Sequence, residues 1–314
     1  MATNQENIIA GIESKLSLSG LNYNEAIFEL AENYGITVSD FNSTFAQLLK
    51  IIGGSDETDI SGLIANYANR YFDNNVNSIN SLTPATGSAY EATFSGCKLL
   101  LDATDSTTIA ASPVATWNDI SGQSNDVAEG TADNRPTYSN PTVTFDGVND
   151  RLGIGYASAG DLRTANFHIF AVVTPTDKGT APYSTIISTQ ALSNGGYWLN
   201  ITDTGLIRTI TNQTGLIPST GITFDQKVLI SYSCDGTTIR IRKNGVELDN
   251  TALGAAIVYP TTNFYVGAAD WGGSINDTIF DGGMHEILFY DNVKSGTDLT
   301  NLETFLINKH NIST

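Results

Sequence analysis

The residues best suited to chemistry in this sequence are aromatic side chains that stand beside amides and carboxylates. A sugar is bound by an aromatic ring stacked under it, while nearby amides and carboxylates hydrogen-bond its hydroxyl groups. Trp271 lies in the segment A-A-D-W-G-G-S, which is typical of a loop, whereas Tyr197 and Trp198 lie in a segment typical of a strand. A strand tryptophan can equally belong to the core, so Trp271 is the preferred ligand residue. The predicted glycan-binding residues are Trp271, Asp270, Asn276, Tyr197 and Trp198.

Two acidic groups have the composition of a calcium site. Hard cations such as Ca²⁺ need several carboxylate or carbonyl oxygens gathered in one turn. The first group is Asp146, Asn149 and Asp150. The second is the loop with Asp270, Asn276, Asp277 and Asp281. Asp and Asn also form turns through their own side-chain hydrogen bonds. Turn formation is therefore the alternative explanation of both groups.

The bulk properties exclude some classes of partner. The net charge of −18 argues against a nucleic-acid binder, because phosphate contacts need a basic surface. No run approaches the ~18 apolar residues of a membrane span, so no membrane contact is expected. The first thirty residues lack the basic and apolar regions of a secretion signal, which predicts synthesis in a cytoplasm. Cys97 and Cys234 are expected to be buried thiols.

The pattern of residues 1–82 predicts a small all-α domain. Apolar residues recur at helical spacing in four short, one-sided runs, which are too short to be stable alone. They must pack on each other or on another chain. Residues 83–94 contain Pro84 and Gly87 among small polar residues and form the predicted linker. The apolar residues expected to dock on a larger assembly are Phe41, Phe45, Leu49, Ile60, Ile64 and Tyr67.

Residues 95–314 change to the spacing of strands. Val228, Ile230 and Tyr232 alternate before Asp235-Gly236, and further alternation precedes Asn244-Gly245. Asp-Gly and Asn-Gly supply the positive φ angles of tight hairpins. About a dozen short strands without βαβ alternation predict a mainly β, antiparallel sandwich. The apolar spacing after residue 295 predicts one closing helix.

Residues 95–312 resemble the concanavalin A-like lectin/glucanase superfamily, in the laminin-G-like branch common in bacterial surface and bacteriophage proteins. The resemblance implies a jelly-roll β-sandwich in which rim loops often hold Ca²⁺. It covers about two-thirds of the chain and leaves out the N-terminal helices. The matching residues are Leu99–Asp102, Trp117-Asn118-Asp119, Ser121-Gly122, Arg135-Pro136, Phe145-Asp146-Gly147, Asp150, Lys243-Asn244-Gly245-Val246, Phe264–Gly267, Gly283–Tyr290 and Leu302–Lys309.

Catalysis is not expected. Glycosidases of this superfamily carry E-x-D-x-x-E on one strand, so that alternation places the acids on one face. The nearest match begins at Glu247 and has Ala252 in place of the last acid. No G-x-S-x-G or H-E-x-x-H motif occurs, and the three histidines are interpreted as structural.

A β-sandwich of this kind is typically a recognition module displayed outside cells, yet the sequence lacks an export signal. This combination fits a bacteriophage virion protein assembled in the host cytoplasm. It would be a capsid decoration or tail/fibre-associated protein. Its helices would dock on other virion proteins, as a homo-oligomer within the assembly. Its sandwich would contact host-surface glycan or neighbouring proteins. The alternative is a bacterial surface carbohydrate-binding protein exported without an N-terminal signal, and a glycoside hydrolase is the third hypothesis.

Overall fold

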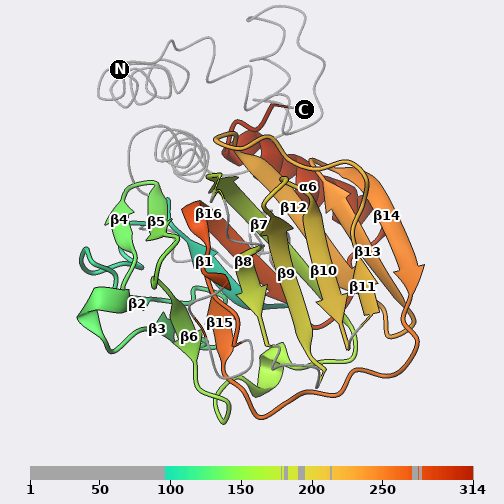
Figure 1. Cartoon of the computed structure of the whole chain (residues 1–314), viewed down its shortest axis with the longest axis horizontal. Helices are drawn as coiled ribbons and strands as arrows, with labels where there is room; N and C mark the ends of the chain where they lie inside the picture. The colour runs from blue at the N-terminus through green and yellow to red at the C-terminus, as the bar shows by residue number, and fades with distance from the viewer. Residues whose placement is uncertain are drawn as a thin grey trace, which may run out of the picture. The chain divides into compact units, whose positions relative to one another are not determined.

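The computed structural model describes residues 96–177, 179, 183–189, 195–212, 214–270, 275 and 278–313. The predicted helical domain, the linker and the six docking residues lie outside this part of the chain. Within it, the predicted sandwich is confirmed, because every strand belongs to one of two antiparallel sheets (Figure 1). None of the helices in the described part has the length and apolarity that a membrane-spanning helix requires.

The first sheet, sheet A, has eight strands in the order β14-β13-β12-β7-β16-β5-β4, with β1 also paired to β16. β7 lies near its centre and is buried along almost its whole length, as its apolar sequence predicts. The strands are β1 (Cys97–Asp102), β4 (Thr137–Ser139), β5 (Thr142–Asp146), β7 (Phe167–Pro175), β12 (Val228–Cys234), β13 (Thr238–Lys243), β14 (Val246–Ala252) and β16 (Asp281–Tyr290).

The second sheet, sheet B, has eight strands in the order β11-β10-β9-β8-β15-β6-β3-β2. Strands β8, β9, β10 and β11 are consecutive in the chain and form an antiparallel meander. The strands are β2 (Thr116–Trp117), β3 (Val127–Ala128), β6 (Leu152–Ile154), β8 (Tyr183–Ser188), β9 (Tyr197–Thr202), β10 (Ile207–Thr211), β11 (Thr214–Leu216) and β15 (Phe264–Val266). Two 3₁₀ helices, η1 (Ala132–Asn134) and η2 (Gly160–Leu162), lie in the connections.

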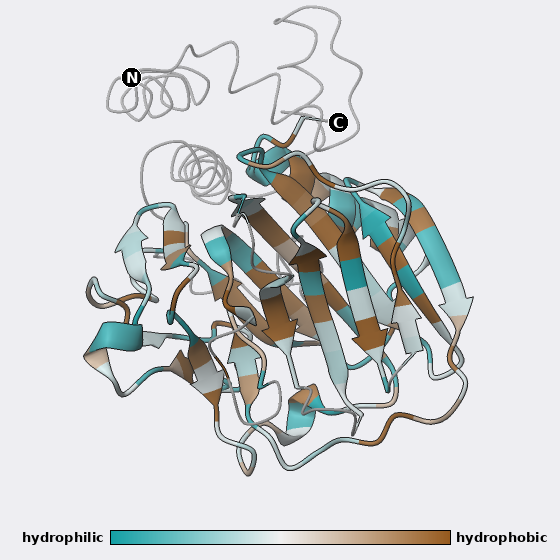
Figure 2. Ribbon diagram, viewed as in Figure 1, coloured by the Kyte–Doolittle hydropathy of each residue, from teal (hydrophilic) through white to brown (hydrophobic). Residues whose placement is uncertain are grey.

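The hairpin predicted at Asn244-Gly245 is confirmed. These two residues connect β13 to β14 and have φ angles of 47° and 81°. Positive φ at both central residues gives a turn whose twist matches the paired strands. The edge strand β14 is largely hydrophilic and the central strands are apolar (Figure 2). A polar edge strand protects a sheet from pairing with other chains.

The main core lies between the two sheets and includes Trp117, Phe145 and Phe289, all buried. Cys97 and Cys234 are buried free thiols, as predicted. A second apolar cluster lies on the outer face of sheet A, where the closing helix α6 (Gly296–Lys309) covers it with Leu302 and Leu306. Each sheet therefore buries its inner face, but helix α6 covers an outer face only on sheet A.

Ion pairs also attach helix α6 to sheet A. Arg242 of β13 binds the buried carboxylate of Glu303 through two hydrogen bonds, Nε–Oε1 at 2.7 Å and Nη2–Oε2 at 2.9 Å. Such two-point pairing fixes direction as well as distance. The amphipathic pattern of the helix was enough to predict its existence, but not this attachment.

Candidate functional site

Strand β9 separates the two aromatic residues that the sequence places side by side. Neighbouring side chains of a strand point to opposite faces of the sheet. Tyr197 points into the core, where its ring packs 4.8 Å from that of Phe167 and its hydroxyl donates to the Leu162 carbonyl. The prediction that Tyr197 binds glycan is therefore wrong, because the other sheet covers this side of β9. Trp198 points to the outer face of sheet B.

Trp198 is the centre of a cluster on that outer face. Its Nε1 donates to Thr185 Oγ1 at 2.8 Å, and Tyr183 meets its ring edge-on at 5.4 Å. Ile210 and Ala269 complete the apolar part of the cluster. The Trp198 ring is 0% exposed, so it supports the surface from beneath and is not itself an open platform. We call the outward-facing residues Tyr183, Thr185, Trp198, Asn200, Thr202, Arg208 and Ile210 the Trp198 face.

A guanidinium group lies over the two aromatic rings. The Arg208 Cζ atom lies 4.4 Å from the ring centre of Tyr183 and 5.0 Å from that of Trp198. Cations at such distances are attracted by the electron-rich ring faces. Burial lowers the pKa of Arg208, which nonetheless stays charged. Tyr183, Thr202 and Arg208 are partly exposed, so they form the accessible part of the Trp198 face.

Asn200 lies between these groups with an unsatisfied amide. Its side chain is 0% exposed, and neither Oδ1 nor Nδ2 has a hydrogen-bond partner among the described residues. Leaving a buried polar group unpaired costs about 1–3 kcal/mol. Nη1 of Arg208 is likewise buried and without a partner. Buried polar groups are normally paired, so these groups need a partner, and a bound ligand could supply one.

Sequence reasoning missed Tyr183, Asn200 and Arg208. Alternation in β9 shows that Asn200 shares a face with Trp198, and this signal was available. The positions of Tyr183 and Arg208 depend on strand register, in which Thr185 and Arg208 flank Asn200 on either side. Register across three strands is not readable from one sequence.

The loop around Trp271, also predicted to bind glycan, begins at the same face of sheet B. Ala269, next to Asp270, packs in the Trp198 cluster, so the 269–270 segment and β9 lie together. Asp270 is partly exposed. Trp271 and Asn276 lie outside the described residues, and their roles stay predictions.

The first acidic group forms a self-contained turn. Asp146 Oδ1 accepts the backbone N–H groups of Val148 and Asn149, and Asp150 Oδ2 accepts that of Asp146. Burial raises the pKa of Asp150 to about 6. Asp281 lies opposite Asp146 in the pairing of β5 with β16.

A calcium site is not visible in this turn. In the part of the chain that the structure describes, no three His, Cys, Asp or Glu side chains are grouped to hold a metal. Asp277 lies outside that part. Turn formation accounts for the contacts of Asp146 and Asp150, and calcium binding stays a prediction.

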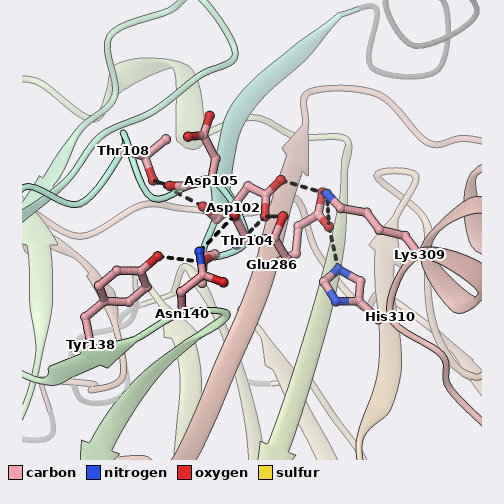
Figure 3. A network of polar contacts seen from close by, with 10 residues as sticks. Asp102, Thr104, Asp105, Thr108, Tyr138, Asn140, Glu286, Lys309 and His310 are labelled. Atoms are coloured by element: carbon pink, nitrogen blue, oxygen red, sulfur yellow. Dashed lines mark hydrogen bonds and ion pairs between the residues drawn. The ribbon is translucent and has the colours of Figure 1, made fainter. Parts of the chain in front are cut away.

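A buried charged network lies under helix α6 (Figure 3). Asp102 of β1 and Glu286 of β16 are cross-strand partners. Lys309 Nζ lies 2.7 Å from Asp102 Oδ2 and 2.8 Å from Glu286 Oε2, and His310 Nε2 lies 2.6 Å from the same Glu286 atom. Both carboxylates are 0% exposed. The network therefore has the groups of a catalytic site, but it is closed to substrates and holds the helix on the sheet.

The other two histidines are also structural, as predicted. The Lys294 backbone N–H donates to Nδ1 of His168, so Nε2 carries the proton and donates to Ser231 Oγ at 2.7 Å. Burial, then repulsion from Arg242, lowers the pKa of His168 to about 3. His285 bonds the Pro141 carbonyl and the Thr174 hydroxyl, and burial lowers its pKa to about 4.

Comparison with known proteins identifies solved structures with a similar fold. No protein-family model and no curated protein matches the sequence. The binding domain of Paraclostridial Mosquitocidal Protein 1 is similar in structure, with a TM-score of 0.53 at 10% identity over 69% of this chain and 53% of that chain. The botulinum neurotoxin serotype D ligand binding domain, in complex with N-acetylneuraminic acid, has a TM-score of 0.52 at 15% identity, covering 70% and 53% of the two chains.

Trypanosoma rangeli sialidase in complex with sialic acid has a TM-score of 0.50 at 14% identity, and the match covers 70% of this chain and 34% of that chain. The chain thus spans about half the length, or less, of these structures. Identities this low show the fold alone. The described residues form a two-sheet, antiparallel β-sandwich.

Proposed function

We propose that residues 96–313 form a carbohydrate-recognition module whose binding surface is the Trp198 face. The observation that carries this proposal is the buried, unpaired amide of Asn200 beside a stacked Tyr183–Arg208 pair. Sugar sites combine an apolar ring surface with a few fixed polar groups. The neurotoxin domain of similar fold, solved with N-acetylneuraminic acid, supports the same role.

Each group on the Trp198 face has a distinct part in this proposal. Tyr183 and Arg208 offer the partly exposed surface that a sugar ring contacts. Trp198, fixed by its hydrogen bond to Thr185, supports the Tyr183 ring from below. Asn200 supplies one donor and one acceptor for ligand hydroxyl or amide groups. Rigid support matters because ordering a mobile side chain on binding reduces affinity.

The proposal is tested by applying the full chain to a panel of neutral and acidic oligosaccharides. We expect at least one class to bind, and Tyr183→Ala to weaken that binding at least tenfold. Tyr156→Ala is the matched control, because Tyr156 also carries a stacked arginine, Arg163 at 4.5 Å, and lies outside the Trp198 face. Equal loss in both variants, or no binding to any oligosaccharide, would contradict the proposal. Trp271→Ala tests the predicted loop in the same assay.

For the whole chain, the finer proposal is a virion protein that docks through residues 1–82. It is supported by the apolar helical pattern of those residues and by the laminin-G-like resemblance. Carbohydrate recognition has the stronger support, since the toxin and sialidase structures described above share the fold. We propose no catalytic activity, because Glu247 lacks the partner acid of a glycosidase strand.

Virion docking predicts that the full chain co-sediments with phage particles and that a chain lacking residues 1–82 does not. The apolar helix faces that would contact the particle are removed in the shortened chain. Circular dichroism verifies that the shortened chain keeps its β structure. Co-sedimentation of a folded shortened chain would show that the sandwich itself docks.

A further inference from the structure

Arg208 differs from the other arginines of the described ranges in its partners. Each of the others donates to a carboxylate or to backbone carbonyls: Arg135, Arg151, Arg163, Arg240 and Arg242. Arg208 has ring contacts and no hydrogen bond or ion pair within those ranges, and its Nη1 is buried without an acceptor. A partly buried guanidinium with no anion beside it has an open position for one.

The register of sheet B shows where the Arg208 side chain lies. Arg208 is on β10 and Tyr183 is on β8, with β9 between them. Asn200 of β9 is paired with Arg208 of β10 on one side and with Thr185 of β8 on the other. The guanidinium lies over the rings of Tyr183 and Trp198, so the side chain reaches from β10 toward β9 on the face that Asn200 shares. Arg208 and the unpaired amide of Asn200 are therefore neighbours on one face.

This arrangement lets one ligand satisfy both residues. Ring contacts alone hold Arg208 among the described residues, so it can shift toward a ligand without breaking a hydrogen bond. A ligand that pairs with Arg208 would also lie beside Oδ1 and Nδ2 of Asn200, its cross-strand neighbour. The two residues together then offer a positively charged fork, one further donor and one acceptor within a single cross-strand pair.

We infer that the ligand of the Trp198 face is an acidic sugar, whose carboxylate pairs with Arg208 and whose hydroxyl or amide groups pair with Asn200; this rests on the proposed function. Guanidinium and carboxylate match in a planar, two-point geometry. The sugar ring would lie against Tyr183. The net charge of −18 repels anions in general, so binding of an acidic sugar requires a local site such as this one.

The experiment uses the full chain and titration calorimetry. The probes are an oligogalacturonide and an oligosaccharide ending in N-acetylneuraminic acid, each beside its methyl ester, which keeps the sugar and removes the charge. We expect at least one acid to bind at least tenfold more tightly than its ester. Arg208→Gln should remove this preference, so that the variant binds the acid no more tightly than it binds the ester. Arg208→Lys should recover only part of it, because an ammonium lacks the planar fork.

Two further variants separate the contribution of Asn200 from that of Arg208. Asn200→Leu removes the amide at similar volume and should weaken acid and ester by the same factor. Arg163→Gln, at the second stacked arginine, should change neither. If acid and ester bind equally, or if Arg208→Gln keeps the preference, the acidic-sugar inference is wrong while the carbohydrate-recognition proposal stands. If neither probe binds as acid or as ester, the acidic-sugar inference is wrong, and the carbohydrate-recognition proposal is decided by the panel of neutral and acidic oligosaccharides. The wild-type comparison of acid and ester needs no variant to fold.

Discussion

Lys309→Met should lower the free energy of unfolding by about 3–5 kcal/mol. Lys309 is the cation shared by Asp102 and Glu286, two buried carboxylates on neighbouring strands. Burial by itself would raise the pKa of Asp102, but attraction to Lys309 and hydrogen bonds from Lys309 and Thr104 outweigh it and hold the pKa below its usual value. Oε1 of Glu286 is buried without a hydrogen-bond partner, so this carboxylate depends on the contacts of Oε2. Chemical denaturation at pH 7 measures the loss.

Lys98→Met is the matched control for this prediction. Lys98 pairs with Asp291 at 3.5 Å, and the two side chains are 26% and 38% exposed. A solvated pair of this kind contributes less than about 1 kcal/mol. Adding Glu286→Gln to Lys309→Met should recover part of the stability, because an amide needs no cation. A loss at Lys309 no larger than that at Lys98 would show that the network does not hold helix α6.

Acidification from pH 7 to pH 4.5 should destabilise the protein by about 2–3 kcal/mol through His168 alone. The folded protein keeps His168 neutral, with a pKa of about 3, while the unfolded chain protonates this histidine below about pH 6.5. Between these values the unfolded state binds the extra proton, so stability falls as the pH falls. Protonated Nδ1 would also face the Lys294 N–H that it now accepts. His285 acts in the same direction over a narrower range, since its pKa is about 4.

His168→Gln should flatten this pH dependence, because the amide can hydrogen-bond Ser231 without titrating. Denaturant unfolding of the wild type and of His168→Gln at pH 7.0, 6.0, 5.0 and 4.5 measures how the free energy of unfolding of each protein depends on pH. Asp150 has the opposite effect: its pKa is raised to about 6, so acidification below that value relieves a cost of folding. Asp150 is present in both proteins, so its contribution cancels in the comparison. Parallel curves for the wild type and His168→Gln would exclude His168 as the cause.

Local patterns in the sequence were sufficient for the elements of the sandwich. Alternation in β12 and β13, and the apolar run of β7, identify strands because side chains of a strand repeat every second residue. Asn244-Gly245 identifies a hairpin because few other residue pairs adopt two consecutive positive φ angles. The spacing of Leu302 and Leu306 identifies a helix with one buried face. These signals depend only on neighbours in the chain, which is why they could be read directly.

The tertiary structure alone decided which of these residues form sites. Alternation shows that Tyr197 and Trp198 point to opposite faces, but only the position of the second sheet determines that Tyr197 is the one that points into the core between the sheets. Arg208 meets Tyr183 because three strands align in one register. Lys309 and Asp102 meet across 207 positions of the chain because the closing helix packs on sheet A. Each of these contacts depends on which faces pack together, and that choice is made by burial of the whole core rather than by any local sequence.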